Sequence, residues 1–92
     1  MVDAVRNNEA ESRYELAVEG QTAFAAYDLR GDVVAFTHTV VPKVLEGKGI
    51  AGRLIKETLA DVRASGRKIV PLCSFVAAYV QRHPEEADLV AD

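Results

Sequence analysis

Between residues 13 and 41, apolar and polar positions alternate in a way that is typical of strands with one buried face. The first run is Arg13–Val18, and an aromatic-rich second run covers Thr22–Leu29. A third run, Val33–Val41, follows after another short turn. Because only a few residues separate these runs, we predict three strands in an antiparallel meander.

The spacing of apolar residues changes to a helical period after a loop. The periodic positions are Ile50, Leu54, Ile55, Leu59 and Val62. Gly66 is predicted to end this helix, because glycine is the usual residue just after a helix. Arg63, Arg67 and Lys68 suit the negative end of its dipole.

A second strand–helix unit follows. The apolar run Lys68–Leu72 predicts a fourth strand, and its proline at position 71 places it at a sheet edge or ends it there. Ser74 is predicted to cap a second helix over Phe75–His83, which Pro84 ends.

The order of these elements predicts one α+β domain over residues 13–92, preceded by a flexible polar tail over residues 1–12. We expect a mostly antiparallel sheet of about four strands with two helices. A chain of 92 residues can bury enough apolar surface to fold alone, but only marginally. We expect a monomer or a weak homodimer.

The composition of the whole chain limits the classes of partner and cofactor that we expect. A net charge of −3 argues against a general nucleic-acid binder. Cys73 is the only cysteine, so no intramolecular disulfide can form. No segment has the signal-peptide or membrane-spanning pattern, and we expect a cytoplasmic protein with no membrane partner. No cluster of His, Cys, Asp and Glu has metal-ligand spacing, so we predict no metal.

Three glycines mark the junction between the third strand and the first helix, at positions 47, 49 and 52. Glycine allows a ligand to approach the backbone closely. A helix N-terminus adds free N–H groups and a positive dipole end, which together suit a phosphate. Lys48 and Arg53 add positive charge. The P-loop pattern does not fit, because Gly49 is followed by Ile50. The dinucleotide spacing fits, but antiparallel strands precede it in a short chain.

The same segment resembles the GNAT acetyltransferase superfamily, which carries Gln/Arg-x-x-Gly-x-Gly/Ala at a strand-to-helix junction. Gly49 and Ala51 match the last two fixed positions, whereas Glu46 stands where Arg or Gln is usual. A short branch of about this length is more similar still, over roughly Arg13–Val90. The matching segments are His38-Thr39-x-Val41-Pro42, Glu46–Ile50, Val70–Cys73, Phe75–Tyr79 and Arg82–Pro84.

This resemblance implies acetyl-CoA as co-substrate and an N-acetyltransferase activity, with an unknown acceptor such as a small amine or a protein. It places the pyrophosphate of the coenzyme on the loop amides and the pantetheine arm along the third strand. The predicted coenzyme-binding residues are Val40, Val41, Gly47, Lys48, Gly49, Ile50, Ala51, Gly52 and Arg53.

Three residues are candidates for catalysis. Cys73 lies where a strand ends and a helix begins, which favours its thiolate, and the resemblance implies that it lies near the thioester. The alternative is a small buried thiol. Tyr79 resembles the tyrosine that protonates the departing CoA thiolate in many GNAT enzymes; the alternative is a core aromatic residue with no catalytic role. His38 is a candidate general base for an amine acceptor; the alternative is a strand histidine that faces solvent.

Two further functions stay open from the sequence. The helices that larger GNAT enzymes place between their first strands, where the acceptor binds, have no counterpart here. That omission suits a large acceptor, but it equally suits a non-catalytic acyl-CoA-binding or interaction module. A purely structural domain would leave the glycine segment without a role.

Overall fold

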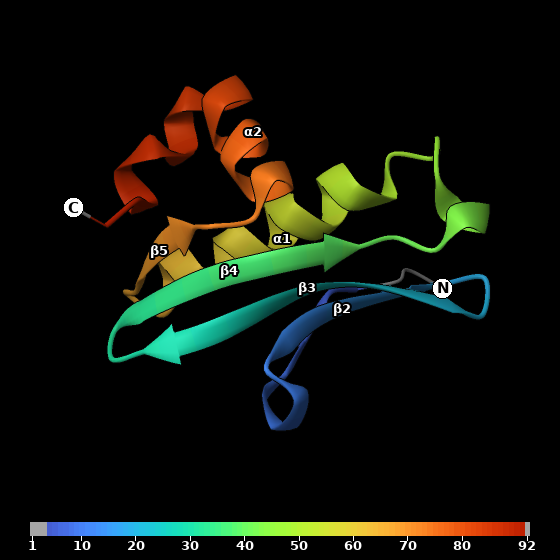
Figure 1. Ribbon diagram of the computed structural model, residues 1–92, viewed down its shortest axis with the longest axis horizontal. Coiled ribbons are helices and arrows are strands. Elements are labelled where there is room, and N and C mark those ends of the chain that lie inside the picture. The colour runs from blue at the N-terminus through green and yellow to red at the C-terminus, as the bar shows by residue number, and fades with distance from the viewer. Residues whose placement is uncertain (1–3, 92) are drawn as a thin grey trace.

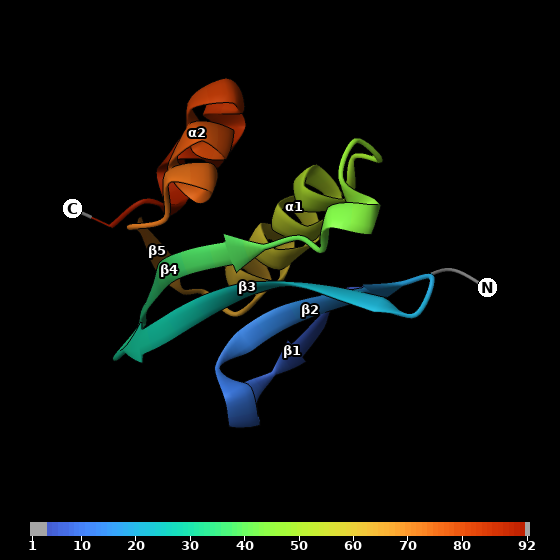
Figure 2. The ribbon, with the colours of Figure 1, turned by 45° about the vertical axis from the view of Figure 1, so that its right-hand side comes forward.

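The computed structural model describes residues 4–91 and has one five-stranded sheet with both main helices on the same face (Figures 1 and 2). The strands are β1 (Arg6–Asn8), β2 (Arg13–Val18), β3 (Gln21–Arg30), β4 (Val33–Val40) and β5 (Lys68–Pro71). The helices are α1 (Ile50–Ala64) and α2 (Ser74–Arg82), with 3-10 turns η1 (Glu9–Glu11), η2 (Lys43–Leu45) and η3 (Pro84–Leu89).

The strand order β1-β2-β3-β4-β5 confirms the predicted α+β class and the antiparallel meander. β5 joins β4 in parallel, as expected when a helix carries the chain back across a sheet. β5 is an edge strand that ends at Pro71, as the sequence predicts. The sheet has one strand more than expected.

That extra strand, β1, lies in the segment predicted to be a loose tail, and for residues 6–11 this prediction is wrong. Arg6 pairs with Glu15 of β2 in antiparallel register. The Glu15 carboxylate accepts hydrogen bonds from Arg6 at 2.9 Å, Asn8 at 3.1 Å and Arg13 at 2.6 Å. These hydrogen bonds add to the backbone pairing of β1 with β2, and β1 itself has no apolar alternation. Residues 1–3 of the predicted tail lie outside the described residues.

Glu15→Gln is expected to lower the free energy of unfolding by about 1 kcal/mol at neutral pH, because it removes the anion that binds β1. The hydrogen bonds from Arg13 and Arg6 outweigh burial and lower the pKa of Glu15 to about 2, from 4.5. The stabilisation is therefore present above pH 4.5 and is lost as the pH falls toward 2. Urea unfolding of the wild-type protein and of Glu15→Gln, at pH 7 and at pH 2.5, measures the difference between their free energies of unfolding at each pH. The same difference at the two pH values would contradict this explanation.

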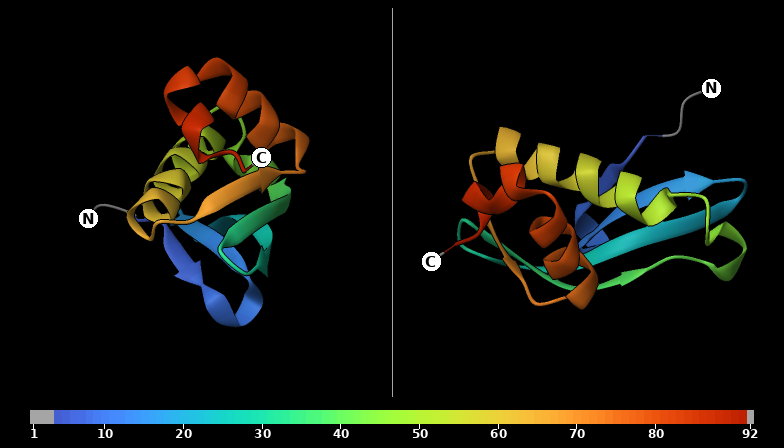
Figure 3. Two further views of the ribbon diagram at one scale, coloured as in Figure 1. Left: turned by 90° about the vertical axis from the view of Figure 1, so that its left-hand side faces the viewer. Right: turned by 90° about the horizontal axis from the view of Figure 1, so that it is seen from above.

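α1 supplies most of the contact between the helices and the sheet, and it runs back over one face of the sheet between β4 and β5 (Figure 3). Its apolar face is the predicted one: Ile50, Leu54, Ile55, Leu59 and Val62 are all buried. They pack with sheet residues such as Leu16 and Phe36, both of which are fully buried. Removing this apolar area from water provides the main driving force for folding.

β4 and β5 separate at one end of the sheet. Their last paired residues are Phe36 and Pro71, and the backbone N–H of Cys73 then donates to the Phe36 carbonyl at 2.9 Å. The chain turns into α2 there, while β4 continues to Val40. In the described part of the chain, the end of β4 has no strand on its β5 side, which leaves an open strand edge.

Candidate functional site

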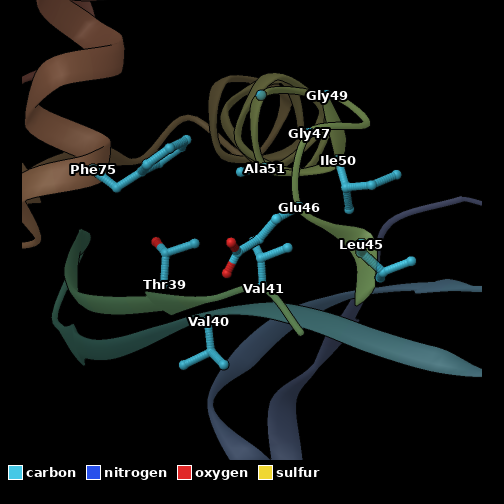
Figure 4. Close-up of a pocket in the computed structure, with 11 residues that line it drawn as sticks. Thr39, Val40, Val41, Leu45, Glu46, Gly47, Gly49, Ile50, Ala51 and Phe75 are labelled. Carbon is cyan, nitrogen blue, oxygen red and sulfur yellow. The ribbon is translucent and has the colours of Figure 1, made fainter. Parts of the chain in front are cut away.

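A cleft of about 630 Å³ lies where β4 and β5 separate, between the end of β4 and the first turn of α1 (Figure 4). Its lining residues come from β4, the following loop, α1 and α2. They are Thr39, Val40, Val41, Leu45, Glu46, Gly47, Gly49, Ile50, Ala51, Gly52 and Phe75. Seven of the nine predicted coenzyme-binding residues are in this set, so the structure gathers them at one site.

The floor of the cleft is the open end of β4. Figure 4 shows the side chains of Thr39 and Val41 directed toward α1, whereas Val40 points away from it. This follows from the alternation of side chains along a strand. Val40 therefore contributes its backbone to the cleft, and the open edge can accept an extended ligand that carries amide groups.

The glycine segment forms the wall nearest α1. Gly47 and Gly49 have φ angles of 82° and 72°, which other residues adopt only with strain. The first helical hydrogen bond runs from the Arg53 N–H to the Gly49 carbonyl at 3.2 Å. The N–H groups that precede it have no intrahelical partner. No side chain caps this end of α1 and its first turn has no acidic residue, so it suits an anion.

Glu46 is the departure from the usual coenzyme motif, and it lines the cleft. Figure 4 shows its carboxylate directed toward the β4 floor near Val41, away from the glycine segment. A carboxylate repels phosphate but accepts hydrogen bonds from amide N–H groups. Its position therefore suits the amide-containing part of a ligand rather than the phosphate.

Cys73 lies behind the cleft rather than on its surface, at 7% exposure. Its Sγ is 3.4 Å from Oγ1 of Thr39, which does line the cleft. Burial raises the pKa of the Cys73 thiol, but hydrogen bonds from the Thr39 hydroxyl and from backbone N–H groups of Val76 and Phe75 outweigh it, so the pKa is lowered. Cys73 itself is the N-cap of α2. The predicted cap at Ser74 is wrong, because Ser74 is already the first helical residue.

Tyr79 does not line the cleft. It lies between α2 and α1, where its ring stacks on His83 with the centroids 4.1 Å apart. Burial, followed by the charges of Glu86 and Glu85, raises the pKa of the Tyr79 hydroxyl. The structure therefore separates Tyr79 from the cleft that Thr39 lines.

His38 lies on the opposite face of β4 from Thr39. Thr39 pairs with the buried Ala25, whereas His38 packs edge-on against Phe24, with the ring centroids 6.2 Å apart. His38 is exposed. It can reach the end of β4 only from the open face of the sheet.

Lys48 and Arg53 are both paired with carboxylates instead of lining the cleft. Lys48 Nζ lies 3.1 Å from Glu19 in the β2–β3 turn. Arg53 Nε lies 2.8 Å from Glu57, one helical turn further along α1. An anion at this end of the cleft would therefore meet backbone N–H groups rather than these two side chains.

The sequence did not indicate Thr39, Leu45 and Phe75 as lining residues. Glu46 belongs to the segment predicted to cradle the pyrophosphate, and only the role of its side chain was left open. Thr39 and Phe75 meet only because β5 returns the chain beside β4.

Two further observations concern metal ligands and membrane-spanning helices. Within residues 4–91, no three His, Cys, Asp or Glu side chains lie close enough together to hold a metal ion. In the same part of the chain, neither main helix combines the length and the apolar character that crossing a membrane requires.

The fold is an antiparallel meander joined by one parallel strand, with a glycine-rich helix start at the point where β4 and β5 separate. The family model described as GCN5-related N-acetyl-transferase matches residues 13–89. The chain therefore belongs to the GCN5-related N-acetyltransferase family. A comparison with curated proteins gives no match.

Proposed function

We propose that this domain is an acetyl-CoA-dependent N-acetyltransferase whose coenzyme lies in the cleft between β4 and α1. The observation that carries the proposal is the juxtaposition of an uncapped helix N-terminus with an open strand edge. The first suits a pyrophosphate and the second suits the amides of pantetheine. The family match adds acyl transfer as the activity.

The reacting end of the coenzyme is proposed to lie near Thr39, at the end of the cleft next to Cys73. Attack on the thioester carbonyl forms a new bond at carbon, and the C–S bond breaks to release the CoA thiolate, which then takes up a proton. In the proposed route the Cys73 thiolate, formed when the thiol gives up its proton, is the first nucleophile. The acceptor amine then attacks the acetyl-Cys73 thioester, the bond between the acetyl carbon and Sγ breaks, and the Cys73 thiolate is released. The acetylated nitrogen loses its extra proton to solvent.

Attack by the acceptor is proposed to come from the open face of the sheet, where His38 is exposed, through the gap between β4 and β5 beyond Phe36 and Pro71. Among the described residues no helix covers that face (Figure 2). A flexible or bulky acceptor, such as a lysine side chain of a protein, can therefore approach. Titration of ¹⁵N-labelled protein with acetyl-CoA tests coenzyme binding, and release of the free CoA thiol tests transfer.

A further inference from the structure

An irregularity interrupts β4 just before the cleft. Phe36 pairs with Tyr27 of β3 and His38 pairs with Ala26, so Thr37 is an extra residue between two paired positions, which is a β-bulge. The Thr37 hydroxyl donates to the Ala26 carbonyl at 3.3 Å. One extra residue reverses the order in which the following side chains point to the two faces of the sheet.

This bulge decides which way Thr39 points. Phe36 is buried in the core, and regular alternation beyond it would turn His38 toward the helices and Thr39 toward the open face. The structure has the opposite arrangement, with His38 against Phe24 and the Thr39 side chain directed toward α1 (Figure 4). The bulge therefore brings the Thr39 hydroxyl to the side on which Cys73 lies, with Oγ1 3.4 Å from Sγ.

Backbone groups hold Cys73 independently of this contact. Its N–H donates to the Phe36 carbonyl at 2.9 Å, and its carbonyl accepts from the Ala77 N–H at 3.0 Å. The sulfur also accepts hydrogen bonds from the backbone N–H groups of Phe75 and Val76 at the start of α2. An amide N–H can only donate, so these groups suit a thiolate but cannot accept the proton of a thiol.

The Thr39 hydroxyl differs from these amides in two ways. It can donate to the thiolate or accept from the thiol, because a hydroxyl carries both a proton and lone pairs. It also lines the cleft, whereas Cys73 is 93% covered and lies behind it. Within residues 4–91, Thr39 provides the one side-chain hydrogen bond to the sulfur, on the side from which a thioester would approach.

No charged side chain takes the place of this hydroxyl. The titratable groups on the adjoining elements include Glu46 in the loop after β4, His38 on the other face of β4 and Tyr79 on α2. In the part of the chain that the structure describes, none of them forms a hydrogen bond with the sulfur. The reactivity of Cys73 therefore depends on neutral donors, of which only Thr39 can be removed by changing a side chain.

We propose that Thr39 is the positioning residue of the candidate nucleophile: its hydroxyl holds Sγ of Cys73 toward the cleft and stabilises the thiolate that attacks the thioester. The inference rests on the proposed function, because it assumes that Cys73 is the nucleophile. Its structural basis is the bulge in β4, without which Thr39 would point to the open face.

The pH dependence of alkylation by iodoacetamide tests this role of the hydroxyl. Cys73 is the only cysteine, so loss of free thiol reports on this residue alone. Thr39→Val keeps the shape of the side chain and should shift the midpoint of the alkylation profile upward by about one pH unit, as the loss of one hydrogen bond to a charged group implies. Thr39→Ser keeps the hydroxyl and should keep the wild-type midpoint.

Ser74→Ala is the matched control, because it removes an exposed hydroxyl next to Cys73 in the chain and should leave the midpoint unchanged. Acetyl transfer gives a second readout. At pH 7, Thr39→Val should form acetyl-Cys73 about tenfold more slowly, since a shift of about one unit leaves about a tenth of the thiolate. The Kd for acetyl-CoA should not change, and a higher pH should restore the rate.

An alkylation midpoint that Thr39→Val does not move would overturn the role of Thr39. Equal upward shifts in Thr39→Val and Thr39→Ser would overturn it too, because they would assign the effect to packing. Thr39→Ala removes the same hydroxyl with a smaller side chain and provides the same test if Thr39→Val does not fold. A wild-type protein that never gains an acetyl group at Cys73 would contradict the proposed route instead. The alkylation profile needs no acetyl-CoA, so it decides the role of the hydroxyl separately.

Discussion

Gly52→Leu is expected to abolish coenzyme binding while the domain stays folded. Gly52 lines the cleft, and a Cβ at this position would meet nothing within 4 Å. It lies inside α1 with an ordinary helical φ, so a side chain causes no backbone strain there. Removing a helical glycine stabilises a helix by about 0.5–1 kcal/mol. The leucine side chain would nonetheless occupy the space that the coenzyme needs.

Thermal unfolding with and without acetyl-CoA measures this effect. At a hundredfold excess over Kd, a ligand stabilises the folded state by about 2.7 kcal/mol, which raises Tm by roughly 10 °C or more in a domain of this size. Gly52→Leu should lose this shift and keep an unliganded Tm at or above that of the wild type. Ala60→Leu, on an exposed part of α1, is the matched control and should retain the shift. A full shift with Gly52→Leu would exclude the cleft as the binding site.

Cys73→Ser is expected to retain coenzyme binding and to slow acetyl transfer by at least a hundredfold, the usual scale for losing a catalytic group. Serine can keep the hydrogen bond with Thr39 but is a much weaker nucleophile than a thiolate. The wild-type thiol should also react with iodoacetamide at a lower pH than an ordinary cysteine, because its pKa is lowered. Bound acetyl-CoA should protect it, since the cleft begins at the neighbouring Thr39.

Intact-mass spectrometry follows both reactions. The wild-type protein should gain one acetyl group at Cys73 when no acceptor is present, and Cys73→Ser should gain none. Transfer by Cys73→Ser at more than a tenth of the wild-type rate would show direct attack by the acceptor amine. Slow alkylation that acetyl-CoA does not change would identify Cys73 as a packed core thiol.

Much of the fold could be predicted because most elements carry a clear apolar period. α1 begins at the residue where the helical spacing starts, and β2 has the predicted bounds. β1 was missed because it has no such period and depends on charges gathered around Glu15. The apolar pattern of β4 does not show which of its residues face the helices, because three consecutive residues, from Val34 to Phe36, are all buried.

Only the part of the site that is formed by consecutive residues could be predicted from the sequence. The glycine segment is contiguous, so its place at the cleft followed from the motif. The Thr39–Cys73 contact joins residues 34 positions apart, and the β4–β5 pairing creates it. The side of β4 that His38 occupies and the distance of Tyr79 from the cleft depend on packing in the same way. Lys48 could not be excluded from the sequence, because its partner Glu19 lies in a distant turn.

An NMR titration of ¹⁵N-labelled protein with acetyl-CoA tests most directly whether this cleft is the coenzyme site. The amide signals of Gly47, Gly49 and Gly52 should shift most, because these residues line the cleft where the pyrophosphate is proposed to lie. The amide signals of Thr39 and Val41 should also shift, because the pantetheine arm is proposed to lie along β4. Saturable shifts in these residues are the expected result. Shifts confined to the open face of the sheet, or no saturable shift at all, would contradict it.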